Sequence, residues 1–220
     1  SSKYLDGHAA ALGGVIVDGG NFGFKGNPRY VSFNEPDESY HGLVYADLPA
    51  APFANKCRAQ LVRDMGAIMS PQNAFISFLG CDTLALRMER HSSNAAKVAK
   101  FLSESDKIDW VLHPSLENNK YHALARKYLP DGQGGMLSFG VKGNVKDAAK
   151  FMEALRLVTQ ETHVADTRSC VLHPASTTHR QLSKEELAAA GVPENLIRLS
   201  VGIENPDDII EDLKQALQKI

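Results

Sequence analysis

Lys3 stands among residue types that can support chemistry at its amine. Ser2 precedes it with a hydroxyl group, and the chain continues through Asp6-Gly7-His8 toward a short apolar run. A lysine amine can act as a nucleophile or move protons. The spacing by itself favours a solvated loop lysine, because the flexible ammonium group is most often exposed. A functional interpretation of Lys3 therefore needs support from other segments.

Arg198 is a second candidate. It lies in Ile197–Gly202, IRLSVG, whose alternation predicts a half-buried strand. A lone arginine on a strand most often forms a structural ion pair. Its rigid guanidinium is also the side chain best able to bind a substrate carboxylate through two parallel N–H donors. The segment His173–His179, HPASTTH, is a further feature that favours a functional interpretation of both candidates.

The histidines and glycines do not indicate a metal or nucleotide site. The eight histidines are His8, His41, His91, His113, His122, His163, His173 and His179. None forms H-E-x-x-H or a close helical pair, so hydrogen-bonded loop histidines are favoured over metal ligands. The glycines of Gly132–Gly135 do not match the patterns of phosphate-binding loops. We therefore expect no metal.

Composition excludes several classes of protein. The 220 residues are 43% hydrophobic, enough to fill a core, and 24 basic against 26 acidic residues leave no basic face for nucleic acid. The longest nearly apolar stretch, Ala9–Val17, is about half as long as a membrane helix requires. Cys57, Cys81 and Cys170 lie far apart without a C-x-x-C pair. They predict a reducing, cytoplasmic setting rather than a disulfide framework.

The hydrophobic pattern predicts strands and helices that alternate along the second half of the chain. The expected strands are a buried one at Leu12–Val17, then Ile108–Leu112, Met136–Val141, Cys170–Leu172 and Ile197–Gly202. The expected helices are Asn55–Gly66, Pro71 to about Leu102 with a bend or break at Gly80, Asn118–Tyr128, Val145–Val158, one opened by a capping box at Ser183, and one from Asn205-Pro206 to Lys219. Asn21–Pro52 is expected to be a long irregular excursion.

Several motifs, taken in order, resemble the pyridoxal 5′-phosphate enzymes of cysteine and methionine metabolism. The resemblance covers essentially the whole chain. The motifs that carry it are Ser2–His8 followed by Gly13–Val17, Arg87–His91, Gly134–Met136, His173–His179 and Arg198–Gly202. The excursion, especially Pro36–Leu43, and Gly19–Phe22 are similar to the O-acetylhomoserine sulfhydrylase branch rather than to the shorter lyases and cystathionine γ-synthases.

The resemblance implies a role for each candidate residue. Lys3 would be the Schiff-base lysine and would also move protons at the substrate. Ser2 would contact the cofactor phosphate, and Arg198 would hold the substrate α-carboxylate. His163 stands where members of the family carry Ser or Asn near that carboxylate.

The resemblance also implies an architecture. The fold is expected to be α/β, of the pyridoxal-phosphate-dependent transferase type (aminotransferase-like, fold type I). Residues 1–85 would form the end of the large cofactor-binding domain, including Lys3, and residues 86–220 a smaller C-terminal α+β domain. Because the family's cofactor domain begins well before its lysine, we expect the chain to be one part of a longer enzyme whose N-terminal half is a partner of this part. A homodimer or homotetramer is expected for the whole.

The expected reaction is a γ-replacement of methionine biosynthesis, in which O-acetyl-L-homoserine and sulfide give L-homocysteine and acetate. Two other interpretations stay open. One is a cystathionine or methionine γ-lyase-type enzyme that breaks a carbon–sulfur bond with the same cofactor. The other is a non-catalytic C-terminal assembly fragment. Small molecules, and neither nucleic acid nor membrane, are the expected partners.

Overall fold

The computed structural model describes all of residues 1–220 and divides into two compact units. Unit 1 consists of Ser1–Ala11 and Phe75–Ile220, and unit 2 consists of Leu12–Ala74. The domain boundary expected after residue 85 stays a prediction, because these units describe compactness within this chain alone.

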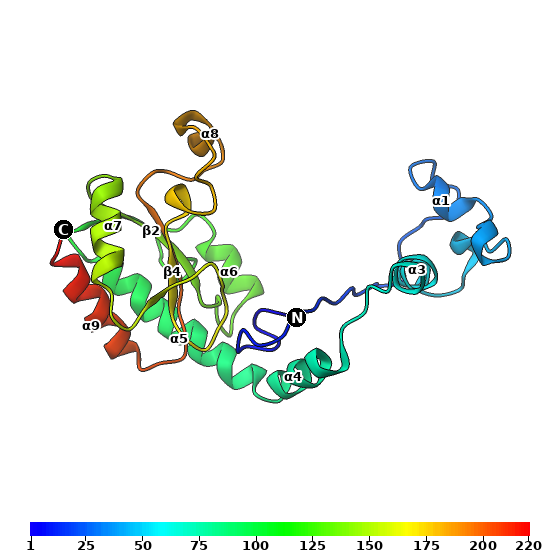
Figure 1. Ribbon diagram of the computed structural model, residues 1–220, viewed down its shortest axis with the longest axis horizontal. Coiled ribbons are helices and arrows are strands. Elements are labelled where there is room, and N and C mark those ends of the chain that lie inside the picture. Colours follow the sequence, from blue (N-terminus) through cyan, green and yellow to red (C-terminus); the bar gives the residue numbers. More distant parts are fainter. The chain divides into compact units, whose positions relative to one another are not determined.

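Unit 1 is built on a five-stranded sheet with the strand order β1-β2-β5-β4-β3 (Figure 1). Its strands are β1 (Ile108–Leu112), β2 (Met136–Val141), β3 (Thr159–Gln160), β4 (Cys170–Leu172) and β5 (Leu196–Ser200). Every neighbouring pair is antiparallel except β3 and β4. The sequence predicted all but β3, which is too short to show a periodicity.

Alternating side chains give the sheet one buried apolar face. Leu137 and Phe139 of β2 lie opposite Leu199 and Ile197 of β5, and all four are in the hydrophobic core. Because side chains of a strand alternate between faces, Arg198 belongs to the other face of the sheet. The core face is covered by three helices, α5, α7 and α9 (Figure 1). The sheet therefore separates a packed helical layer from the face that carries Arg198.

The helices follow the predicted pattern with shifted ends. They are α1 (Val31–Asn34), α2 (Pro52–Lys56), α3 (Arg63–Met65), α4 (Pro71–Asp82), α5 (Leu84–Ser103), α6 (His122–Tyr128), α7 (Val145–Ala154), α8 (Lys184–Ala189) and α9 (Pro206–Leu217). A π-helical stretch, Cys57–Val62, joins α2 to α3, and 3-10 turns occur at Glu38–Tyr40, Tyr45–Asp47 and Pro174–Ser176.

Several helix ends confirm the predicted caps. The Ser183 hydroxyl accepts from Glu186 N while the Glu186 carboxylate accepts from Ser183 N, which is the predicted capping box of α8. Asn205 caps α9 by accepting from Asp207 N. The long helix that begins at Pro71 does break, but at Thr83 rather than at Gly80. A β-carbon on Gly80 would lie 2.4 Å from the backbone carbonyl oxygens of Leu5 and Asp6, so this glycine allows close packing instead.

Unit 2 has its own aromatic core in place of a sheet. The rings of Phe24 and Phe33 stack at 4.2 Å, and Phe33 contacts Tyr45 edge-on. The Asp37 carboxylate accepts a hydrogen bond from the Tyr45 hydroxyl at 2.9 Å, which satisfies the polar end of this buried ring. The predicted irregular excursion, residues 21–52, is confirmed, because before Pro52, where α2 begins, it contains only a four-residue helix and two 3-10 turns.

The buried strand expected at Leu12–Val17 is wrong. These residues form neither a helix nor a strand, and Leu12, Ile16 and Val17 are 77%, 62% and 87% exposed. A buried strand needs neighbouring strands to satisfy its backbone groups. No strand of this chain pairs with the run, so its apolar composition does not produce burial here.

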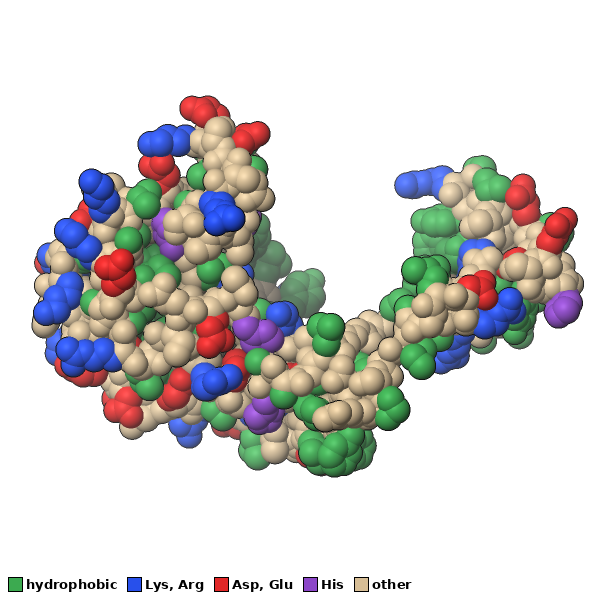
Figure 2. All heavy atoms as spheres, in the orientation of Figure 1, with side chains coloured by type: hydrophobic (Ala, Val, Ile, Leu, Met, Phe, Trp, Pro, Cys, Tyr) green, Lys and Arg blue, Asp and Glu red, His purple; other side chains and the backbone are tan.

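Apolar side chains are also exposed along α4. Phe75, Phe78 and Leu79 are 61%, 67% and 49% exposed, and Figure 2 shows apolar side chains gathered over this helix. The sequence placed these residues on a helix by their spacing, which the structure confirms. No helix in the structure is both long and apolar enough to cross a membrane.

Candidate active site

A network of backbone turns holds the segment that carries Lys3. Asp6 N donates to Ser1 O at 3.1 Å, and Gly7 N donates to Lys3 O at 2.8 Å. The buried Asp6 carboxylate accepts from His8 N and Ala11 N. These bonds fix the segment as a compact loop, while the Lys3 side chain itself is exposed.

Arg87 of α5 joins this loop to the helices. Its guanidinium is buried and donates to three backbone carbonyl oxygens, those of Tyr4 at 2.8 Å, Leu5 at 3.3 Å and Gly80 at 2.6 Å. Burial lowers the pKa of Arg87, and the nearby Asp6 carboxylate opposes that shift. The loop around Lys3 is therefore attached to α4 and α5 by one side chain.

Tyr4 provides a second attachment, to the edge of the sheet. Its hydroxyl accepts from Gly135 N at 3.0 Å, directly before β2, and burial raises its pKa. The Tyr4 ring lies edge-on to His91, with 5.2 Å between centroids. His91 Nδ1 in turn donates to Val201 O at 2.7 Å. Burial lowers the pKa of His91, because protonation would place a second N–H in a site with no acceptor for it.

The Lys3 side chain faces His163. The Nζ atom of Lys3 lies 3.5 Å from Nδ1 of His163, a residue of the loop between β3 and β4. Arg198 lies beside the same loop, where its Nη2 donates to the carbonyl oxygen of Thr162 at 2.8 Å. Thr162 and His163 are consecutive, so the loop brings the two predicted site residues, Lys3 and Arg198, into one cluster.

The other predicted residues take different places. Ser2 is partly buried beside Lys3. His173 is buried and donates from Nε2 to Glu194 O at 2.7 Å, while its Nδ1 pairs with the Ser176 hydroxyl at 2.8 Å. Both nitrogens thus stabilise the loop after β4. The candidate role of Ser2 at a cofactor phosphate remains a prediction, and so does the role of Arg198 at a carboxylate.

Sequence reasoning did not assign a role to Arg87 or Asp6. Arg87 lies in the LRMERH run of α5 and Asp6 lies three residues after Lys3, so each is within a motif that the resemblance used. Neither could be recognised as a support of Lys3, because their partners are backbone atoms that show no sequence pattern.

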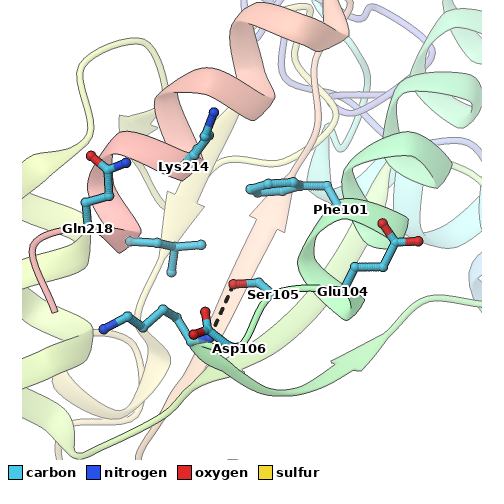
Figure 3. Close-up of a pocket in the computed structure, with 8 residues that line it drawn as sticks. Phe101, Glu104, Ser105, Asp106, Lys214 and Gln218 are labelled. Carbon is cyan, nitrogen blue, oxygen red and sulfur yellow. Dashed lines mark hydrogen bonds between the residues drawn. The ribbon is translucent and has the colours of Figure 1, made fainter.

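A cavity at the C-terminal ends of α5 and α9 is separate from this cluster. It is lined by Phe101, Glu104, Ser105, Asp106, Lys107, Lys214, Leu217 and Gln218. Figure 3 labels all of these except Lys107 and Leu217. No residue of the Lys3 cluster lines it, and it adds nothing to the site. No group of three or more His, Cys, Asp and Glu side chains is placed to hold a metal ion.

Comparison with known proteins decides the family. The model of the Cys/Met metabolism PLP-dependent enzymes matches residues 1–218. The chain belongs to this family. A homocysteine synthase from Schizosaccharomyces pombe is 46% identical over 99% of the chain and 51% of its own length. An O-acetyl-L-homoserine sulfhydrylase from Leptospira meyeri is 45% identical over 100% of the chain and 52% of its own length.

A solved structure shares the fold. It is named as an O-acetylhomoserine (thiol)-lyase from Campylobacter jejuni with a pyridoxyl-lysine phosphate. It has a TM-score of 0.93 and 43% identity, and the match covers 99% of this chain and 52% of that one. The expected fold class, an α/β pyridoxal-phosphate enzyme of fold type I, is confirmed. The chain spans about half the length of the curated relatives it matches.

The residues of the cluster fit the cofactor of a PLP-dependent family. Lys3 offers an exposed primary amine, the group that forms a covalent bond with an aldehyde. Ser2 offers a hydroxyl beside it, and Arg198 offers a planar guanidinium in the same cluster. An amine, a hydroxyl and a guanidinium are the donors that an aldehyde, a phosphate and a carboxylate require.

Proposed function

We propose that the protein to which this chain belongs converts O-acetyl-L-homoserine and sulfide into L-homocysteine and acetate. One observation carries the proposal: the Lys3 amine and the Arg198 guanidinium lie beside consecutive residues of one loop, His163 and Thr162. A reactive amine and a carboxylate receptor are two groups that a protein supplies for a γ-replacement of an amino acid that depends on pyridoxal phosphate. Relatives named homocysteine synthase and O-acetyl-L-homoserine sulfhydrylase support the choice of substrates.

Each residue has a distinct task in this proposal. Pyridoxal phosphate, when bound, withdraws electrons from the α-carbon of an amino acid. Lys3 would be the point of covalent attachment, and its amine, released from the cofactor while the substrate is bound, would move protons at Cα and Cβ during the replacement. Arg198 binds the α-carboxylate with the flat edge of its guanidinium and so orients the Cα–H bond. Ser2 donates its hydroxyl to the cofactor phosphate.

Overall the reaction exchanges one group for another at Cγ. The bond from Cγ to the acetate oxygen breaks, a bond from Cγ to sulfur forms, and acetate leaves with the oxygen. No net oxidation or reduction occurs. The reaction is a transfer of methionine biosynthesis, and the substrates are small molecules.

The test combines an assay with chemical mapping. The intact protein is expected to produce homocysteine from O-acetyl-L-homoserine and sulfide, and borohydride reduction followed by peptide mapping is expected to place the pyridoxyl label on Lys3. A label on another lysine would contradict the assignment of Lys3. Release of a keto acid from cystathionine or methionine, without sulfide addition, would identify a γ-lyase instead.

The assembly and setting of the protein form part of the same proposal. We infer a homodimer or homotetramer in a reducing cytoplasm. Light scattering that finds an active monomer would contradict the oligomer.

A further inference from the structure

Ala165, in the loop between β3 and β4, has a backbone conformation that alanine rarely adopts. Its φ is 68°, in the left-handed region, and the residue is buried, with an exposed fraction of 1%. A residue with a β-carbon is strained there, and such strain persists only where surrounding contacts hold it. Because strained residues cluster at functional sites, the contacts that hold Ala165 indicate what its conformation serves.

Ser200 of β5 provides the contact at Ala165 itself. The backbone N–H of Ala165 donates to the Ser200 hydroxyl oxygen at 2.8 Å, and both residues are buried. Ser200 lies two residues after Arg198 on the same strand, so the two side chains share one face of the sheet. A buried N–H without an acceptor is costly. The bond to Ser200 therefore favours the left-handed conformation of Ala165.

The strained residue lies between two bonds that tie the loop to the predicted site residues. Before it, the carbonyl oxygen of Thr162 accepts from Arg198 Nη2 at 2.8 Å. After it, the N–H of Thr167 donates at 3.0 Å to the carbonyl oxygen of Gly7, in the segment that carries Lys3. A guanidinium has five N–H donors, so the bond to the loop leaves others for a carboxylate. The loop thus connects the guanidinium to the lysine segment.

The same loop is anchored to the sheet on both sides of Ala165. The carbonyl oxygen of His163 accepts from the Cys170 thiol at 3.1 Å. The carbonyl oxygen of Thr167 accepts from Ile203 N at 2.8 Å. Because these anchors hold the loop on either side, a change of φ at Ala165 would not be absorbed by a free end and would move the carbonyl groups between them.

We infer that Ala165 and Ser200 are positioning residues, which hold the Arg198 guanidinium where it binds the α-carboxylate of an amino acid whose amino group lies at the cofactor on Lys3. The left-handed turn shapes the loop, and the Thr162 carbonyl then orients the flat guanidinium. This inference rests on the proposed function, since it takes Lys3 and Arg198 in the roles given there. It does not depend on the group that leaves Cγ.

The test compares two ligands that differ only in the carboxylate. L-Norvaline has the α-carboxylate but no leaving group at Cγ, and butylamine is the same chain without the carboxylate. The intact protein with pyridoxal phosphate bound is titrated with each ligand, and the absorption of the cofactor gives the dissociation constant. Arg198→Ala is the reference. It is expected to raise the constant for norvaline by about tenfold or more and to leave that for butylamine within about twofold.

Ser200→Ala is expected to show the same pattern, although Ser200 does not touch the ligand. Loss of the hydroxyl releases the strained turn and misaligns Arg198, so the dissociation constant for norvaline rises about tenfold while that for butylamine stays within about twofold. A role of Ser200 in packing alone would change both constants equally or neither. Either of those results would overturn the inference.

A second substitution separates the strain from the lost hydroxyl. Glycine adopts a positive φ without strain, so Ala165→Gly alone is expected to leave both constants within about twofold of wild type. Added to Ser200→Ala, it is expected to return the constant for norvaline to within about threefold of wild type. Because the double variant removes the strain, it also serves if Ser200→Ala does not fold. A double variant that fails to fold, or that binds norvaline as weakly as Ser200→Ala, would overturn the inference.

The outcome for the reaction is separate. If the two ligands respond as expected but no homocysteine forms, the proposed reaction is rejected and the positioning role stands. If homocysteine forms while the two ligands respond alike, the inference alone is rejected. A wild-type protein that binds norvaline no more tightly than butylamine would also overturn the inference, because no carboxylate receptor would then be in place.

Discussion

The Nη1 atom of Arg87 lies 2.8 Å from the backbone carbonyl oxygen of Tyr4, the residue directly after Lys3. A guanidinium that binds backbone carbonyl groups rather than a carboxylate holds a chain segment in place. Here the segment carries Lys3, whose Nζ lies 3.5 Å from His163 Nδ1. The geometry of the candidate site therefore depends on a residue that does not reach the reacting atoms.

Replacement of Arg87 is expected to destabilise unit 1. Arg87→Ala removes the guanidinium donors to Tyr4 O and Leu5 O and leaves Gly80 O with only its longer bonds from Thr83, at a cost of about 2–4 kcal/mol in the free energy of unfolding. Arg90→Ala, on an exposed position of the same helix, is the control and is expected to change it by less than about 0.5 kcal/mol. Urea denaturation measures both. Equal effects of the two variants would show that the carbonyl contacts of Arg87 contribute nothing.

Gly80→Ala is expected to displace the Lys3 loop. The added β-carbon would meet the carbonyl oxygens of Leu5 and Asp6 at 2.4 Å, and neither backbone group can move freely. Such overpacking costs about 1–3 kcal/mol, of which the better helix propensity of alanine offsets about 0.5–1 kcal/mol. Thermal unfolding measures the change in melting temperature. Gly66→Ala is not a suitable control, because Gly66 has a positive φ of 68°. A raised melting temperature in Gly80→Ala would contradict the close packing.

Arg198 is expected to act in substrate binding rather than in stability. Arg198→Lys keeps the charge but loses the planar pair of donors, and Arg198→Ala loses both. A lost contact to the substrate carboxylate reduces kcat/KM by about 30-fold to 1000-fold. Steady-state kinetics and melting temperatures of both variants distinguish a role in substrate binding from a role in stability. A lower melting temperature with unchanged kinetics would show that the bond to Thr162 is purely structural.

Stability is expected to fall as the pH drops below about 6.5, the pKa of an unfolded histidine. The pKa values of His91 and His113 are lowered mainly by burial. Below pH 6.5 the unfolded chain therefore binds more protons at these residues than the folded chain. The free energy of unfolding then decreases by up to about 1 kcal/mol for each histidine between pH 7.5 and 5.5.

Urea denaturation at the two pH values checks this pH dependence. His91→Phe is expected to reduce the difference between them, because it removes one of the two titrating groups. A wild-type protein that became more stable at pH 5.5 would contradict the direction of both shifts.

Asp212 is expected to anchor the chain after α7. Its carboxylate accepts from the backbone N–H groups of Arg156, Leu157 and Val158, each at 2.9 Å. Asp212→Asn replaces one accepting oxygen by an amide donor that faces these N–H groups, and about 2 kcal/mol of stability is lost. Glu211→Gln, at an exposed neighbouring position, is the control. Chemical denaturation of the two variants should differ, and equal stability would exclude the anchoring role.

The sequence correctly predicted those helices and strands whose formation depends mainly on the residues within them. Met136–Val141 forms β2 at the predicted ends, and the capping box at Ser183 occurs as predicted. The prediction of a buried strand at Leu12–Val17 is wrong because a buried strand needs neighbouring strands from other segments. An apolar run does not reveal whether such strands exist. The helix predicted for Val145–Val158 ends earlier, at Ala154, because the helical spacing of apolar residues continues past the last helical residue.

In the candidate site, too, the sequence revealed residues with a local motif but not contacts between distant segments. Lys3 and Arg198 were found from residue type and motif, and they lie beside one loop. The closeness of His163 to Lys3 could not be predicted, because 160 residues separate them and their contact depends on the sheet. Arg87 was missed for a related reason, since its partners are carbonyl groups that every residue possesses.

The three cysteines differ in a way that permits selective labelling. Cys170 is buried and its pKa is about 11, whereas Cys81 near the end of α4 is exposed. Maleimides and other thiol reagents consume the thiolate, so in a Cys57→Ser variant, which removes the partly exposed third cysteine, they are expected near neutral pH to react at Cys81 and pass over Cys170. A fluorophore at Cys81 would lie on the helix that Gly80 brings against the Lys3 loop. Its emission would then report movements of that loop without any change to the residues around the amine.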